Sequence, residues 1–235
     1  MGSMGAIANI RVQTHAPAYI PTDVITPPLY FDGPASARKT FAFAHGAGVG
    51  MDSEFMNDVA AQLGNAGIRV ARFEFPYMQK TRADGKRRPP DRAKVLLETW
   101  GAVIHALGRE NLTIGGKSMG GRMASMRAVH QENAGTPVAG CICLGYPFHA
   151  PGKPEKVRAD HLADTKTPCL ILQGDRDPFG TRAEINGYRL SAAIDVHFLE
   201  DGEHSFIPRK SSGRTQAENW ETAVEEMIRF ISSID

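Results

Sequence analysis

Apolar residues along the chain fall into two kinds of segment, short continuous runs and longer stretches with helical spacing. The continuous runs, with one alternating run at the end, predict strands at Thr40 to Ala44, Ile68 to Phe75, Leu112 to Ile114, Val138 to Leu144, Cys169 to Gln173 and Ile194 to Leu199. The helically spaced stretches predict helices at Ser53 to Leu63, Arg92 to Leu107, Arg122 to His130, Thr181 to Leu190 and Ala217 to Ile231. Strands that alternate with helices indicate an α/β fold, with a mostly parallel sheet covered by helices on both faces.

The remaining segments are predicted to be irregular. Residues 1–39 are rich in proline, which cannot donate to a central ladder, so we expect short edge strands and turns that cover a sheet edge. Met78 to Arg92 is predicted to be a basic loop, and Gly145 to His161 a loop broken by prolines. Neither segment is long enough for a separate lid domain, and residues 1–235 are expected to form a single domain.

Composition excludes some function classes. The 235 residues include 27 basic and 26 acidic side chains, so the formal charge of +1 offers no overall attraction to nucleic acid or to an anionic membrane. No apolar run is long enough to span a bilayer, and the first residues lack the features of a signal peptide, so we expect a cytoplasmic protein. Cys141, Cys143 and Cys169 lie in apolar runs without metal-binding spacing, so we expect buried reduced thiols and no metal or cofactor.

A serine between glycine pairs follows the third predicted strand. Gly116-Lys117-Ser118-Met119-Gly120 matches G-x-S-x-G, in which a strained turn from strand to helix exposes a serine hydroxyl above the sheet. Two other interpretations exist. One is a phosphate-binding loop, whose first glycine is missing because Asn111 stands there, and the other is a turn that only packs a helix against a strand. Ser118 is the candidate nucleophile.

An acid and a histidine follow later strands in the order that this motif requires. Asp177 comes after the fifth predicted strand, and His204 comes after the last one. Because sites in such sheets gather outside the carboxyl ends of the strands, we expect Ser118, Asp177 and His204 to converge. The alternatives at this stage are Asp175 for the acid and His45, His149 or His161 for the base.

The ordered motifs resemble those of the α/β-hydrolase superfamily, and most closely its compact, lidless dienelactone-hydrolase-like branch. The residues that carry the resemblance are His45 to Gly48, Arg72 to Tyr77, Gly115 to Arg122, Leu144 to Pro147, Gly174 to Gly180 and Gly202 to Phe206. The resemblance extends over nearly the whole chain from Thr40 onward and implies the α/β-hydrolase fold with minimal or no lid. Dienelactone hydrolases carry cysteine at the elbow, and this chain carries serine, so their substrate is not carried over.

The resemblance also implies roles for individual residues. His204 is expected to act as general base toward Ser118 and then as acid toward the leaving group, while Asp177 holds the imidazole tautomer. The backbone N–H groups of Ala47 and Met119 are expected to form the oxyanion hole. Candidate pocket-lining side chains, for which a place in the core is the alternative, are Tyr77, Met78, Tyr146, Phe148, Phe179 and Phe206.

Serine-dependent hydrolysis of small or flexible carboxylic esters is therefore the leading hypothesis, with thioesters and amides as other substrates. The rival from another class is a non-catalytic binding module that keeps the fold as a scaffold. A weaker hypothesis assigns the selection of anionic substrates to the basic side chains Arg82, Lys86, Arg87 and Arg88. The expected partner is a small-molecule ester, and the sequence predicts no oligomeric state.

Overall fold

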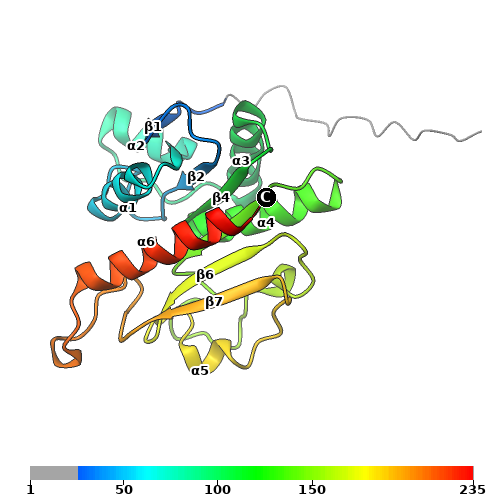
Figure 1. Cartoon of the computed structure of the whole chain (residues 1–235). Coiled ribbons are helices and arrows are strands. Elements are labelled where there is room, and N and C mark those ends of the chain that lie inside the picture. Colours follow the sequence, from blue (N-terminus) through cyan, green and yellow to red (C-terminus); the bar gives the residue numbers. More distant parts are fainter. Residues whose placement is uncertain (1–25, 235) are drawn as a thin grey trace, which may run out of the picture.

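The structure, a computed structural model, describes residues 26–234 and confirms an α/β fold. The strands are β1 (Tyr30–Asp32), β2 (Thr40–Ala44), β3 (Arg69–Phe73), β4 (Leu112–Lys117), β5 (Gly140–Leu144), β6 (Cys169–Gly174) and β7 (Ile194–Leu199). They form a seven-stranded sheet in the order β1-β3-β2-β4-β5-β6-β7 (Figure 1). β1 is antiparallel to β3, and the other neighbouring pairs are parallel, as predicted.

Helices cover both faces of the sheet, as predicted. The helices are α1 (Glu54–Asn65), α2 (Pro76–Asp84), α3 (Ala93–Leu107), α4 (Met119–Asn133), α5 (Arg182–Ile185) and α6 (Gln216–Ser233). One apolar cluster joins α3 and α4 to one face, and a second joins α1 and α6 to the other. Successive residues of a strand point to opposite faces, so Phe41 and Phe43 enter the second cluster whereas Ala42 and Ala44 enter the first.

The first described residues form one edge of the sheet. β1 pairs with β3, and its Tyr30 and Phe31 side chains are exposed. This strand agrees with the edge strand expected within residues 1–39, whereas Pro17 and Pro21 lie outside the described residues. Arg72 on β3 donates from Nε and Nη2 to the two carboxylate oxygens of Asp32, at 2.8 and 2.9 Å, and so attaches the end of β1 to the sheet.

Two predicted elements differ from the structure. The stretch from Met78 to Arg92 is not all loop, because α2 occupies its first half. Pro76 fits the first helical position, where its missing N–H would have no partner, and Gly85 ends the helix with φ 71°. The helix predicted for Thr181 to Leu190 is only the four-residue α5, which begins with a capping box from Thr181 to Glu184.

Parallel pairing brings the carboxyl ends of neighbouring strands to one edge of the sheet. The register places Ala44 beside Gly116, and Lys117 beside Leu144. The loops that follow these strands therefore start side by side. Between β5 and β6, the described chain contains one 3₁₀ turn, Asp160–Leu162, and no inserted helical domain. Among residues 26–234, no helix combines the length and the apolar character needed to cross a membrane.

Candidate active site

Ser118 lies in a strained turn between β4 and α4. Its φ of 50° and ψ of −114° belong to a region that residues with a side chain seldom adopt. A Cβ added at Gly116 would come within 2.5 Å of the Ala44 carbonyl oxygen, and one at Gly120 would come within 2.5 Å of the His45 carbonyl oxygen. Close approach of three backbone segments therefore requires glycine on both sides of the serine.

The loops after β4, β6 and β7 bring the three candidate residues together. Ser118 Oγ lies 2.9 Å from His204 Nε2, and His204 Nδ1 lies 2.8 Å from Asp177 Oδ2. A carboxylate only accepts hydrogen bonds, so Nδ1 carries a hydrogen and donates it to Asp177. Nε2 then has a free lone pair that accepts the hydrogen of the Ser118 hydroxyl. This arrangement allows the imidazole to take a proton from the serine while the carboxylate holds its other side.

Asp177 is fully buried, and both of its carboxylate oxygens are engaged. Oδ1 accepts from the Phe179 N–H at 2.8 Å, and Oδ2 accepts from Gln173 Nε2 at 3.0 Å as well as from the imidazole. Asp175, the alternative acid, pairs instead with Arg182 Nε at 2.6 Å. The sequence analysis does not assign Gln173, although a glutamine at the end of an apolar buried strand marks a polar partner in the core.

Two side chains of α6 hold the histidine loop in place. Asn219, which is fully buried, donates from Nδ2 to the Phe206 carbonyl oxygen at 2.9 Å. Trp220 donates from Nε1 to the Ser205 carbonyl oxygen at 3.2 Å. Phe206 has φ 68°, a conformation that a bulky residue adopts only when its surroundings impose it. No local motif predicts these contacts, because they join the loop after β7 to a separate helix, 13 and 15 positions further along the chain.

Lys117, the variable residue before the serine, also contacts the histidine loop. Its Nζ donates to the His204 carbonyl oxygen at 2.6 Å and lies 5.3 Å from the centre of the Phe206 ring. Burial lowers the pKa of Lys117 to about 8, although the Asp177 and Glu203 carboxylates act in the opposite direction. The site thus contains a partly buried lysine amino group that the motif alone does not predict.

Replacing Lys117 by methionine should change how stability depends on pH. In the unfolded chain this lysine keeps its proton up to its usual pKa of 10.5, whereas in the folded protein the pKa is about 8. Between these values the folded state binds fewer protons, so stability rises with pH, by on the order of 3 kcal/mol across the window. Urea unfolding measured at several pH values in this range should show the free energy of unfolding of wild type rising with pH. In Lys117→Met this rise should be absent. Lys80→Met, at an exposed lysine, should retain it. If the free energy of unfolding changed with pH in the same way in wild type and Lys117→Met, the expectation would be contradicted.

The loop after β2 runs beside Ser118. A Cβ added at Gly46 would lie 3.8 Å from Ser118 Cβ. His45 Nε2 accepts from the Phe75 N–H at 3.1 Å, which leaves Nδ1 to donate to the Gly46 carbonyl oxygen at 2.7 Å. Burial lowers the pKa of His45 and favours the neutral imidazole that this pairing requires. His45 is therefore a packed loop residue, and the base that contacts Ser118 is His204.

The two expected oxyanion donors lie in the loop after β2 and at the start of α4. Ala47 follows Gly46 in the loop after β2, and it is exposed. Met119 is the first residue of α4, where backbone N–H groups have no partner within the helix and the helix dipole favours negative charge. Their role as oxyanion donors stays a prediction.

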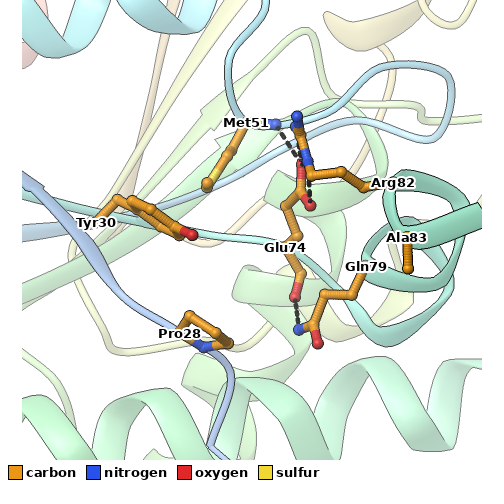
Figure 2. Close-up of a pocket in the computed structure, with 7 residues that line it drawn as sticks. All are labelled: Pro28, Tyr30, Met51, Glu74, Gln79, Arg82 and Ala83. Carbon is orange, nitrogen blue, oxygen red and sulfur yellow. Dashed lines mark hydrogen bonds and ion pairs between the residues drawn. The ribbon is translucent and has the colours of Figure 1, made fainter.

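A cluster of ion pairs fixes the far end of the same loop. Glu74, which is 5% exposed, accepts from the Met51 N–H at 3.4 Å and from Arg82 Nε at 3.0 Å (Figure 2). Arg82 also donates to both oxygens of Asp52, at 2.9 and 3.0 Å. Met51, Glu74 and Arg82 border a cavity of about 260 Å³, with Tyr30 on its opposite side (Figure 2). The polar groups of Glu74, Gln79 and Arg82 at this cavity are paired with one another.

Ion pairs also involve two of the four basic side chains that the sequence analysis singles out between Met78 and Arg92. Arg82 is compensated within the cluster just described, and Arg88 pairs with Asp84 at 2.6 Å. The structure therefore does not support the expectation that these two residues select anionic substrates, because their guanidinium groups are already paired with carboxylates. Lys86 and Arg87 are exposed, and for them the hypothesis stays a prediction.

The six predicted pocket-lining side chains separate into two groups. The buried group, with at most 2% exposed, consists of Tyr77, Tyr146, Phe148 and Phe206. Side chains without exposed surface cannot contact a substrate in this structure, so the prediction is wrong for these four, and the alternative place in the core is correct. Phe179 is partly exposed, and its ring centre lies 4.2 Å from that of His204. Met78 is partly exposed on α2, and its role stays a prediction.

The three cysteines are free and buried, as expected, and they lie together. Their Sγ atoms are all within 4.8 Å of one another, in the apolar cluster that includes α4. The register explains this, because Cys141 on β5 faces Cys169 on β6 and Cys143 lies two residues along the same face. They form the one group of three potential metal ligands within residues 26–234, and apolar side chains surround it.

Comparisons with known proteins agree with this architecture. Residues 37–232 match the sequence model of a family described as an alpha/beta hydrolase domain. A serine hydrolase homologue from Coxiella burnetii is 19% identical, with TM-score 0.62 over 90% of this chain and 99% of that one. Est1E from Butyrivibrio proteoclasticus, with ferulic acid bound, is 17% identical, with TM-score 0.64 over 92% and 99%. Dienelactone hydrolase from Anabaena variabilis is 19% identical, with TM-score 0.63 over 88% and 93%. At these identities the likeness establishes a shared fold.

Proposed function

The chain belongs to the alpha/beta hydrolase domain family, as its motifs suggested, and on that premise we propose that it is a serine hydrolase that cleaves carboxylic esters. The observation that carries the proposal is the hydrogen-bonded chain of Ser118, His204 and Asp177, with distances of 2.9 and 2.8 Å. A serine hydroxyl is a weak nucleophile until a base takes its proton, and this geometry supplies a base whose free lone pair faces the hydroxyl.

The proposed reaction has two stages. Ser118 Oγ attacks the ester carbonyl carbon while His204 Nε2 takes the hydroxyl proton, and a tetrahedral intermediate forms. The imidazolium then gives this proton to the departing alkoxide, which leaves as the alcohol, and the acyl group stays on Ser118. In the second stage His204 takes a proton from water while the water oxygen attacks the acyl carbon, and a second tetrahedral intermediate forms. The bond between the acyl carbon and Ser118 Oγ then breaks, the imidazolium returns the proton to Oγ, and the carboxylic acid is released with the serine hydroxyl restored.

Electrostatic stabilisation has two sources in this proposal. The imidazolium that forms at each stage faces the Asp177 carboxylate, which is buried, so the attraction between them is not screened by water. The oxyanion of the intermediate accepts hydrogen bonds from the N–H groups of Ala47 and Met119. Donors fixed in place before the reaction cost no reorganisation during it, and each is typically worth about 10²-fold or more in rate.

Small or flexible esters are the substrates that the site supports best. The described chain has no helical domain inserted between β5 and β6, where residues 145–168 contain a single 3₁₀ turn, so no such domain restricts the size of the substrate. The Est1E structure holds ferulic acid, a carboxylic acid of the kind that ester hydrolysis releases, in a protein of the same fold. Thioesters and amides can react by the same steps, and amides are harder to cleave because an amine is a poorer leaving group than an alcohol.

A fluorophosphonate probe tests the proposal directly. Wild type should become covalently labelled, and Ser118→Ala should not, because the probe reacts with an activated serine oxygen. Ser36→Ala, at an exposed serine outside the site, should be labelled at the wild-type rate. Unlabelled wild type should also hydrolyse short aryl esters, and labelling should abolish this activity. Equal labelling of Ser118→Ala, or an unlabelled wild type without turnover of esters, thioesters or amides, would refute the proposal and favour a scaffold role.

A further inference from the structure

Tyr77 is joined to the loop that borders the serine. It is the second residue of α2, and only 2% of its surface is exposed. Its phenol oxygen lies 3.2 Å from the Gly46 carbonyl oxygen and 3.1 Å from that of Ala47. The single phenol hydrogen is shared between two carbonyl groups of consecutive peptides. The side chain therefore contacts the loop through its backbone, on the side away from solvent.

These contacts determine where the loop N–H groups point. The peptide bonds of the described residues are all trans, so the C=O of Gly46 and the N–H of Ala47 point in opposite directions. The Gly46 oxygen is held by Tyr77 Oη and by His45 Nδ1, both on the buried side. The N–H of Ala47 is thereby turned outward. The Ala47 oxygen is held in the same way, which turns the next N–H, that of Gly48, outward as well.

The outer part of the loop has little else to fix it. Ala47, Gly48 and Val49 are exposed, and a Cβ added at Gly48 would meet no atom within 4 Å. A peptide next to glycine rotates easily because no side chain restricts it. Without the phenol, the peptide between Ala47 and Gly48 would lose its buried partner, and the one between Gly46 and Ala47 would depend on His45 alone.

We propose that Tyr77 is a positioning residue of the oxyanion hole, whose phenol holds the Ala47 peptide so that its N–H faces the charge that develops on the substrate. The inference rests on the proposed function, because an oxyanion arises only if Ser118 attacks a carbonyl carbon. Tyr77 itself does not touch the substrate, which is consistent with its burial. Burial and the nearby Asp91 and Glu74 carboxylates raise the pKa of Tyr77, so the phenol keeps its donor hydrogen at the pH values at which the imidazole works.

Tyr77→Phe isolates this hydrogen bond, because the ring stays in place while the hydroxyl is lost. We expect kcat for a short aryl ester to fall by about 10-fold to 100-fold, somewhat less than the loss of an oxyanion donor itself, while KM changes less than about 3-fold. An aryl boronic acid, which forms a tetrahedral adduct on Ser118, should bind more weakly by the same factor as kcat/KM. The pH dependence of kcat/KM should keep its shape, because Ser118, His204 and Asp177 are untouched.

Thr99→Val is the matched control. Thr99 is buried and its hydroxyl donates to the Val95 carbonyl oxygen at 2.9 Å in α3, so the variant also removes a buried hydroxyl that is bonded to the backbone. It should lower thermal stability to a similar extent and leave boronate affinity and kcat unchanged. Thermal unfolding of both variants separates a loss of fold from a loss of positioning.

Three outcomes would count against the inference. Boronate affinity and kcat of Tyr77→Phe within about 2-fold of wild type would overturn it, because a single oxyanion donor is worth much more than that. A variant that loses activity only in proportion to unfolded protein would reduce Tyr77 to a structural role. A wild-type protein that neither reacts with the fluorophosphonate nor hydrolyses any acyl substrate would refute the proposed function, and this inference with it.

Discussion

Asp177→Asn should lower kcat/KM for ester hydrolysis by about 10⁴-fold, the size of effect seen when the acid of such a triad is replaced by its amide. The Asp177 carboxylate accepts the hydrogen of His204 Nδ1 at 2.8 Å and that of Gln173 Nε2 at 3.0 Å through the same oxygen. An asparagine that keeps the bond to the Phe179 N–H through its carbonyl oxygen would present an NH₂ group to the imidazole. The imidazole would then carry its hydrogen on Nε2, and it could no longer accept the Ser118 proton.

Asp175→Asn provides the control for this prediction. Asp175 follows the same strand but bonds to Arg182 and not to the imidazole, so its substitution should leave kcat/KM within a few-fold of wild type. Steady-state kinetics with one aryl ester, and the fluorophosphonate labelling rate, measure both variants. A loss in Asp175→Asn as large as that in Asp177→Asn would show that the contact with the imidazole is not what the acid contributes.

Gly116→Ala should destabilise the protein by at least about 3 kcal/mol, the upper part of the range for overpacking, and is expected to impair folding. The added Cβ would lie 2.5 Å from the Ala44 carbonyl oxygen, 2.8 Å from the Gly120 carbonyl carbon and 2.9 Å from the Gly121 nitrogen. All three are backbone atoms of β2 and α4, so no flexible side chain can move aside. Relieving these clashes would require the central strands and α4 to separate, and this separation would expose the apolar cluster between them.

Gly48→Ala is the matched control for stability. It adds the same methyl group in open space, and Gly48 is not among the glycines with positive φ. Its free energy of unfolding should therefore equal or slightly exceed that of wild type, by up to about 1 kcal/mol, because alanine restricts the unfolded chain. Urea unfolding followed by circular dichroism measures both variants. A Gly116→Ala protein with the wild-type unfolding midpoint would contradict the close packing around the elbow.

Much of the fold was predictable because its signals are local. β2 and β7 occupy the residues expected from their apolar patterns, and β6 extends the expected run by one residue. Buried parallel strands are apolar throughout, and helices show their spacing, so neither signal depends on distant residues. The error at α2 has a local cause as well, since a proline that follows a strand can begin either a loop or a helix, and Pro76 begins a helix.

The candidate site was predictable only in part. Ser118, Asp177 and His204 stand out because their residue types, their order and their positions after strands coincide. The four aromatic side chains that proved to be buried could not be assigned from sequence, because a bulky apolar residue beside a loop packs inward or faces a pocket according to what surrounds it. Tyr77 shows this well, since its ring belongs to the core while its hydroxyl reaches the backbone of the loop beside the serine.

The amino-acid sequence alone determined the alternation of strands and helices, the glycine-flanked serine, and the later acid and histidine. Each of these features is recognised from a pattern of residues that are close together in the chain. Only the tertiary structure decided which acid meets the imidazole, that Lys117 and two α6 side chains hold the histidine loop, and that Tyr77 turns the loop after β2. Those contacts join residues up to 87 positions apart, from Lys117 to His204, around one edge of the sheet. Which residues contact one another depends on the strand register and on the conformation of the loops, and the packing of the whole chain determines both.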